Sequence, residues 1–266
     1  MASFVRLLPH RRRCYMLCAV ARSGSNLLAD GLVQIRRAGR LGQYFLPQNE
    51  GRTAHDHGID PKANFAAYIR GIVSAAATAN GVFGFKIMGW YVEKFLARIR
   101  ETGAFGDAAT PDLEMLRRAF PRLQFVQILR QNKMRQAISK ARALQTGLWK
   151  IQEDKRPVAE PQFDPQLIGR CLEDLQHEEN IWAQFFQRIG IEPFRLEYEA
   201  LCRDYEGSIR AVLDFLQVRL PRRIKITAPI TIRQTDVLSD QWEERYLALH
   251  SDRSELVTSM SLRIFS

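Results

Sequence analysis

The chain has 266 residues, of which 46% are hydrophobic and 26% charged, an ordinary composition for a globular protein. This length is sufficient for one large domain, and no linker-like stretch divides it, so we expect a single domain over 1–266 with a basic arm at 1–13. The formal net charge of +10 favours anionic partners such as nucleotides, nucleic acid or acidic lipid, without choosing among them.

The first apolar run, Cys14–Val20, follows the basic run Arg11–Arg13 and is too short to span a bilayer. Arg22 interrupts it without a cleavage-like end, so we expect neither a signal peptide nor a transmembrane helix. The cysteines form no C-x-x-C pair and have no histidine at metal-ligand spacing, so we expect no metal and, by default, a cytoplasmic location. They are Cys14, Cys18, Cys171 and Cys202.

Apolar runs of strand length alternate with amphipathic helices along the chain. Predicted strands cover 14–20, 82–88, 124–129 and 194–197. Predicted helices cover 26–37, 65–77, 92–100, 133–148, 165–188, 205–216 and 241–249. We expect a polar, irregular region at 39–61 and loops at 103–111 and 151–162. The alternation predicts an α/β fold with a central parallel sheet flanked by helices, and ligands bound beyond the carboxyl ends of the strands.

A glycine-containing loop, Arg22-Ser23-Gly24-Ser25-Asn26, joins the first predicted strand to its helix. Such a turn presents backbone N–H groups and a positive helix end, and the arginine adds a forked cation suited to phosphate oxygens. The Walker A pattern is missing, which disfavours an ATP or GTP enzyme of that type. A plain helix start capped by Ser23 or Ser25 is the alternative.

Arg130 leaves the third predicted strand, and Ser139 lies two turns into the following helix. This pair could hold a second phosphate, although an ordinary strand-end arginine explains the segment equally well. Two anion sites at neighbouring strand ends suit a ligand with two separated phosphates, such as 3′-phosphoadenosine 5′-phosphosulfate. A later basic element, Arg233-Gln234, could fold over that nucleotide.

The sequence resembles the bacterial trehalose 2-sulfotransferase family, which is related to lipopolysaccharide and nodulation-factor sulfotransferases. The resemblance covers nearly the whole chain, and its most distinctive elements are Gln145-Thr146-x-x-Trp149 and Arg233-Gln234-x-Asp236. The matching segments are Arg22–Leu28, Gly81–Met88, Arg130–Trp149, Tyr198–Leu201, Ala211–Leu216 and Arg233–Tyr246.

The resemblance implies a P-loop-like sulfotransferase domain that moves a sulfuryl group from 3′-phosphoadenosine 5′-phosphosulfate to a carbohydrate or glycolipid hydroxyl. Arg22 to Asn26 would bind the 5′-phosphosulfate, and Arg130 with Ser139 the 3′-phosphate. Arg233 would cover the nucleotide, and Lys86 would face the reaction centre, unless it is a surface lysine. A homodimer is also implied, with neither metal nor nucleic acid as a partner.

One position departs from the family. Its usual general base is a glutamate in a segment resembling G-x-P-x-E-[FY]-F, and the counterpart here, Gly39–Phe45, has Gln43 in that place. An amide cannot take a proton, so Gln43 can only orient the acceptor. Another base, a different acceptor or weak catalysis would each follow, and Gln43→Glu would raise turnover if a base has been lost. Other proton acceptors in the adjacent stretch are Glu50, His55, Asp56 and His57, although the last three also suit a solvated loop.

Three other functions remain open. A kinase or other phosphotransferase lacks support because no Lys-[Ser/Thr] pair follows Gly24. A basic protein that binds nucleic acid or lipopolysaccharide would account for the charge but not for two arginine loops at strand ends. A catalytically silent relative would account for Gln43. The acceptor itself is not named by the sequence, and we expect 39–65 and 151–162 to shape its pocket.

Overall fold

The computed structural model describes residues 12–60, 64–149, 157–221, 224–227 and 237–249. The chain divides into two compact units: a larger one formed by 1–131 and 177–229, and a smaller one formed by 132–176 and 230–266. The predicted organisation as one sulfotransferase domain stays a prediction.

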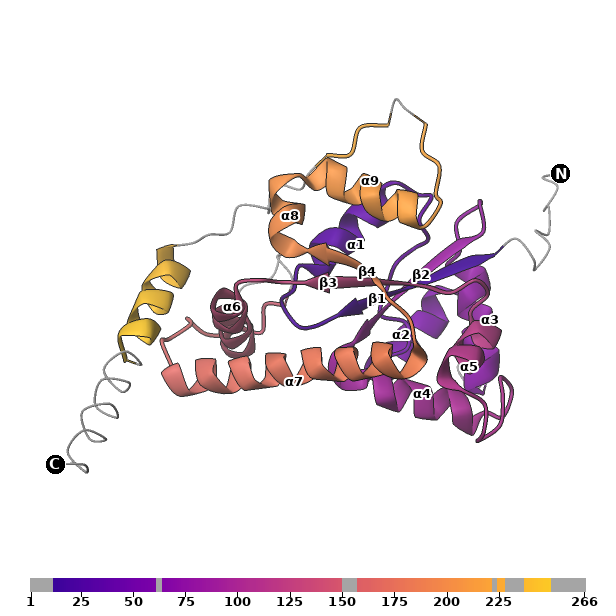
Figure 1. Cartoon of the computed structure of the whole chain (residues 1–266), viewed down its shortest axis with the longest axis horizontal. Coiled ribbons are helices and arrows are strands. Elements are labelled where there is room, and N and C mark those ends of the chain that lie inside the picture. Colours follow the sequence, from indigo (N-terminus) through magenta and orange to yellow (C-terminus); the bar gives the residue numbers. More distant parts are fainter. Residues whose placement is uncertain (1–11, 61–63, 150–156, 222–223, 228–236, 250–266) are drawn as a thin grey trace. The chain divides into compact units, whose positions relative to one another are not determined.

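The larger unit contains a parallel sheet of four strands in the order β2-β1-β3-β4 (Figure 1). Every neighbouring pair is parallel, with Ala19 opposite Met88 and Leu129 opposite Glu197 at the carboxyl ends. The strands are β1 (Arg13–Ala19), β2 (Val82–Met88), β3 (Gln124–Leu129) and β4 (Phe194–Glu197). The α/β class and the central parallel sheet are therefore confirmed, and three of the four strand predictions have the observed bounds.

One face of this sheet is covered by α1 (Ser25–Gln34), α8 (Tyr198–Arg203) and α9 (Tyr205–Phe215), as Figure 1 shows. The hydroxyl of Tyr205 donates to the carbonyl oxygen of Leu27, 3.2 Å away. A Cβ at Gly31 would lie 2.4 Å from that hydroxyl, so the glycine allows α1 and α9 to pack closely. The predicted helix 26–37 ends earlier, at Gln34, and α8 was not predicted.

The other face is covered by aromatic side chains. From α7 (Pro165–Ile189), the part after residue 176 contributes Trp182, Phe185 and Phe186, and both phenylalanines contact Phe125 of β3. Beside β2, the rings of Phe85 and Phe120 stack with centroids 4.5 Å apart. The apolar side chains of the helix predicted at 165–188 therefore pack in the core.

The region 39–61, predicted to be irregular, contains a helix, α2 (Pro47–Asp56), so that prediction is wrong. A proline at the first helical position and an acidic residue in the first turn favour the helix start. The helix lies at the surface with only Ala54 buried, and its polar, glycine-containing sequence lacks the apolar periodicity that would reveal it.

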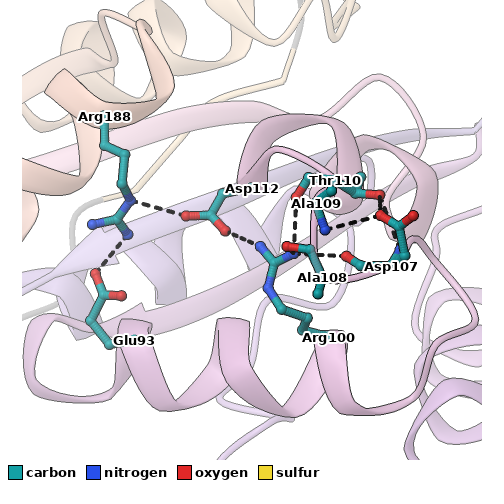
Figure 2. A network of polar contacts seen from close by, with 8 residues as sticks. All are labelled: Glu93, Arg100, Asp107, Ala108, Ala109, Thr110, Asp112 and Arg188. Atoms are coloured by element: carbon teal, nitrogen blue, oxygen red, sulfur yellow. Dashed lines mark hydrogen bonds and ion pairs between the residues drawn. The ribbon is translucent and has the colours of Figure 1, made fainter.

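Two further helices, α3 (Phe65–Ala75) and α4 (Val92–Glu101), agree with the prediction, whereas α5 (Asp112–Ala119) was not predicted. The carboxylate of Asp112 accepts hydrogen bonds from Arg100 at 2.6 Å and from Arg188 at 3.0 Å. Figure 2 shows how Arg188 also reaches Glu93 of α4, so that one carboxylate joins α4, α5 and the end of α7.

The smaller unit contains α6 (Lys133–Thr146), the first part of α7 and a helix at 237–249. Polar side chains of α6 contact the helix at 237–249: Arg135 pairs with Asp240 and Glu243, and Arg142 donates to the hydroxyl of Ser239 at 2.8 Å. None of the helices in the described part of the chain combines the length and the apolar composition that a membrane span requires.

Candidate active site

The loop after β1 turns sharply into α1. Arg22 and Gly24 both have left-handed backbone conformations, with φ angles of 60° and 87°. The N–H group of Ser23 donates to the carbonyl oxygen of Val20 at 3.3 Å, which closes the turn. A non-glycine residue with positive φ is uncommon and strained, and such strain is concentrated at ligand-binding sites.

The N-terminus of α1 is open to an anion. Gly24 occupies the N-cap position, no side chain caps the helix, and its first turn has no acidic residue. Neither Ser23 nor Ser25 is the cap, so the alternative of a plain capped helix start is wrong. The hydroxyl oxygen of Ser23 is buried and has no hydrogen-bond partner among the described residues. A phosphate or sulfate oxygen would satisfy this hydroxyl together with the first backbone N–H groups of the helix.

Lys86 lies in the interior of β2 and is only 7% exposed, so it is not a surface lysine. Its ammonium nitrogen lies 2.7 Å from the Oδ1 atom of Asn26 and 3.4 Å from the hydroxyl of Ser25. The tertiary structure thus places a cation from the second strand directly at the loop that follows the first strand.

Arg130 follows β3, which lies beside β1 in the sheet. Its Nη1 atom donates to the carbonyl oxygen of Arg22 at 3.4 Å, and its guanidinium carbon lies 4.6 Å from the ring centroid of Tyr198. The two arginines that the sequence singled out are therefore neighbours at the carboxyl edge of the sheet.

Tyr198, the first residue of α8, lies at the predicted site, although the sequence did not single it out as a site residue. A Cβ at Gly24 would lie 2.3 Å from its ring, which shows how closely the ring covers the loop. Burial and the neighbouring Cys202 raise the pKa of Tyr198 to about 12, so the ring remains neutral at physiological pH. The sequence alone assigns Tyr198 no role, because its contact with Gly24 joins residues more than 170 positions apart.

Two further residues were predicted to bind the nucleotide. Ser139 is in α6 of the smaller unit, and its pairing with Arg130 stays a prediction. Arg233 lies outside the described residues.

Gln43 lies beside the strand that carries Lys86. Gly42 forms a parallel bridge with Phe85, and the backbone N–H of Lys86 donates to the carbonyl oxygen of Gly42 at 2.9 Å. The next residue, Gln43, is half-buried, and its carbonyl oxygen accepts a hydrogen bond from Asn49 at 3.0 Å. The position that departs from the family pattern is thus adjacent in space to the predicted reaction centre.

The other proposed bases in this region have different surroundings. Both carboxylate oxygens of Glu50 accept hydrogen bonds from Arg98, which neutralises that side chain. His55 and Asp56 are exposed at the end of α2 and lie 3.4 Å from each other. Burial, with a further contribution from Arg40, lowers the pKa of His57.

Two pockets lie in other parts of the larger unit. One of about 840 Å³ is lined by Arg100, Asp112, Arg117 and Arg188 among others, and a second of about 310 Å³ by Arg13, Arg37, Asn80, Gln217 and Arg219. Neither is lined by a predicted site residue. Among the described residues, no group of three or more His, Cys, Asp or Glu side chains could hold a metal ion.

A parallel sheet with an uncapped helix N-terminus after its first strand is typical of phosphate-binding α/β proteins. Residues 14–248 match the family model for Stf0 sulphotransferase, and the chain belongs to that family. It is therefore an Stf0-type sulfotransferase, and the resemblance stated from sequence is confirmed. Membership of this family implies 3′-phosphoadenosine 5′-phosphosulfate as the donor.

Two relatives carry the name trehalose 2-sulfotransferase. The one from Mycobacterium tuberculosis is 27% identical over 261 residues, which covers 89% of this chain and 95% of the relative. The one from Mycolicibacterium smegmatis is 27% identical over 259 residues, with 87% and 93% covered. The sulfotransferase domain of the Synechococcus PCC 7002 olefin synthase overlaps with a TM-score of 0.46 and 13% identity, covering 88% of this chain and 82% of that one.

Proposed function

We propose that the protein transfers a sulfuryl group from 3′-phosphoadenosine 5′-phosphosulfate to a hydroxyl of a carbohydrate or glycolipid. The proposed sulfuryl donor is supported above all by the uncapped N-terminus of α1. There the buried hydroxyl of Ser23 lacks a partner among the described residues, and the ammonium group of Lys86 lies beside Ser25. These groups are donors or cations, and they suit the oxygens of a phosphosulfate.

Each donor-binding residue has its own role. Arg22 and the loop N–H groups would bind the 5′-phosphosulfate, and Lys86 would stabilise charge on the oxygen that bridges phosphorus and sulfur as that bond breaks. Arg130 with Ser139 would bind the 3′-phosphate, and Arg233 would close over the nucleotide. The acceptor hydroxyl attacks sulfur in line with the leaving oxygen, as in phosphoryl transfer.

The acceptor proposal rests on the relatives, whose names specify trehalose. At 27% identity a related glycan or glycolipid suits this chain equally well. We further propose a homodimer and a cytoplasmic location, both carried over from the sequence. A nucleotide-binding relative with weak catalysis is the second candidate, since Gln43 replaces the expected base.

The donor half is tested by thermal shift with 3′-phosphoadenosine 5′-phosphate and with ATP. A ligand that binds only the native state raises the unfolding temperature, so specific stabilisation by the bisphosphate is expected. No shift at saturating bisphosphate would reject the proposed donor site, and an equal shift with ATP would favour a phosphotransferase. The acceptor half is tested by transfer of radioactive sulfate from the donor to trehalose and to glycolipid extracts.

A further inference from the structure

The smaller of the two pockets lies at the amino edge of the sheet, at the opposite end of β1 from the loop that is predicted to bind the donor. Its volume is about 310 Å³. All its described lining residues belong to the larger unit. They are Arg13, Arg37, Asn80, Gln217 and Arg219. Arg13 begins the seven-residue strand β1, whose two ends are about 20 Å apart, so the pocket is separate from the predicted donor site.

Backbone contacts fix Arg13 at this pocket. Its Nη1 atom donates to the carbonyl oxygen of Gln217 at 2.7 Å and to that of Leu216 at 3.5 Å. Leu216 is the C-cap of α9, so Arg13 also stabilises the end of that helix. The other guanidinium nitrogens of Arg13 donate no hydrogen bond to a described residue. Since a guanidinium group has five N–H donors in a rigid fork, Arg13 keeps donors for a ligand in a fixed position.

Two further arginines reach the pocket from distant parts of the sequence. Arg37 follows the end of α1, and Arg219 follows the end of α9. The side-chain nitrogen of Asn80 donates to the carbonyl oxygen of Arg37 at 2.8 Å, which holds this segment against the turn before β2. Both arginines are exposed, and neither pairs with a carboxylate in the described part of the chain.

The charge of this pocket is not balanced by its own lining. Three arginines line it, and none of its described lining residues is acidic. The larger pocket differs in this respect. There Arg100 and Arg188 share the carboxylate of Asp112, and Arg118 pairs with Glu114. Like charges that converge repel one another, so a bound anion would stabilise the smaller pocket more than the larger one.

We propose that the smaller pocket is an anion-binding site that holds the phosphoryl or sulfuryl group of a small ligand other than the sulfuryl donor. Guanidinium groups bind such groups through paired N–H bonds, and the amide of Gln217 adds a neutral donor. The volume of about 310 Å³ is near the lower limit for small-molecule pockets, which suits a phosphate ester or a pyrophosphate rather than a polymer. This inference does not depend on the proposed sulfuryl transfer.

The test compares Arg37→Gln and Arg219→Gln with the parent. Arg36→Gln is the matched control, because it removes the same charge from an exposed neighbour that does not line the pocket. Arg13 is left unchanged, since it also caps α9. Inorganic pyrophosphate is titrated into each protein by calorimetry. A lipid source of the phosphoryl group is tested by cosedimentation with phosphatidylcholine vesicles, with and without phosphatidic acid.

The parent is expected to bind pyrophosphate, and each pocket variant to bind it about fivefold or more weakly, because a charge-assisted hydrogen bond is lost. Arg36→Gln should stay within about twofold of the parent, since an exposed charge outside the site contributes little. The same pattern of losses with phosphatidic acid vesicles would identify a lipid headgroup as the ligand. Losses with pyrophosphate alone would identify a free phosphate compound.

Affinity of either pocket variant within about twofold of that of Arg36→Gln, for both probes, would overturn the proposal, because net charge alone would then account for binding. A parent that binds neither probe would also overturn it. Thermal unfolding checks that the variants fold, as expected for exposed side chains without a carboxylate partner among the described residues. If one variant does not fold, the other decides by the same criterion.

Discussion

The ring of Tyr198 lies against the backbone of Gly24, so closely that a Cβ on the glycine would be 2.3 Å from its Cδ2 atom. On its other side the same ring contacts the guanidinium group of Arg130 at 4.6 Å. Tyr198 therefore lies between the loop after β1 and Arg130 after β3, the two elements that are predicted to bind anions. This arrangement couples the shape of the loop to the position of the arginine.

Gly24→Ala is expected to weaken bisphosphate binding by about tenfold or more, because the φ angle of 87° disfavours a side chain and the added methyl group displaces Tyr198. The free energy of unfolding should fall by about 1–3 kcal/mol. Calorimetry and thermal unfolding measure the two effects. Gly103→Ala is the control, since its φ is 62° but its Cβ would meet no atom within 4 Å. Equal loss of affinity in both variants would contradict the role of the Tyr198 contact.

Tyr198→Leu is expected to lower bisphosphate affinity by about two- to thirtyfold, because it removes the aromatic face under Arg130. Tyr198→Phe keeps that face and should bind as the parent. Titration calorimetry of both variants separates the ring from its hydroxyl. A loss in Tyr198→Phe equal to that in Tyr198→Leu would show that the hydroxyl, rather than the ring, positions the site.

Lys86→Met is expected to lower turnover by about 10²–10³-fold, the usual cost of removing one group that stabilises transition-state charge. Bisphosphate affinity should fall much less, because that product lacks the bond whose cleavage creates the charge. Steady-state kinetics and calorimetry give the two values. Lys94→Met, on the exposed face of α4, is the control. Equal losses in affinity and turnover would show that Lys86 contributes only to binding.

His57 is expected to make the protein less stable in acid. Burial lowers the pKa of His57 below its ordinary value of 6.5, so the unfolded chain binds this proton more readily than the folded one. The contribution of His57 to stability is then fully present above the ordinary pKa and is lost as the pH falls below it. Between about pH 7.5 and 5.5, one unit either side of the ordinary pKa, the unfolding temperature of His57→Gln should fall less than that of the parent. His55→Gln, which removes an exposed side chain, should follow the parent.

Asp112→Ala is expected to lower the free energy of unfolding by about 1–3 kcal/mol, because it leaves Arg100 and Arg188 without their shared carboxylate (Figure 2). Bisphosphate affinity should not change, since none of the predicted site residues contacts this network. Glu114→Ala removes an exposed i,i+4 pair with Arg118 and should cost about 0.5 kcal/mol or less. Denaturant unfolding measures both, and equal losses would contradict the structural role of Asp112.

The strands β1, β2 and β3 could be predicted closely from the sequence because each is a short, mostly buried run. The helices with an apolar face were predicted for the same reason. The helices α2 and α8 were not, since α2 buries only Ala54 and α8 buries only Leu201. Short surface helices depend on caps and neighbours more than on hydrophobic periodicity.

Local patterns along the chain are enough to predict the α/β class, the family and the loop from Arg22 to Asn26. Three other features depend on how the chain folds: Lys86 is buried at that loop, Tyr198 lies between Gly24 and Arg130, and Glu178 approaches Gly89. Strand order and helix packing bring these residues together across long stretches of sequence. No local pattern encodes such contacts, since they arise from burial of the whole core.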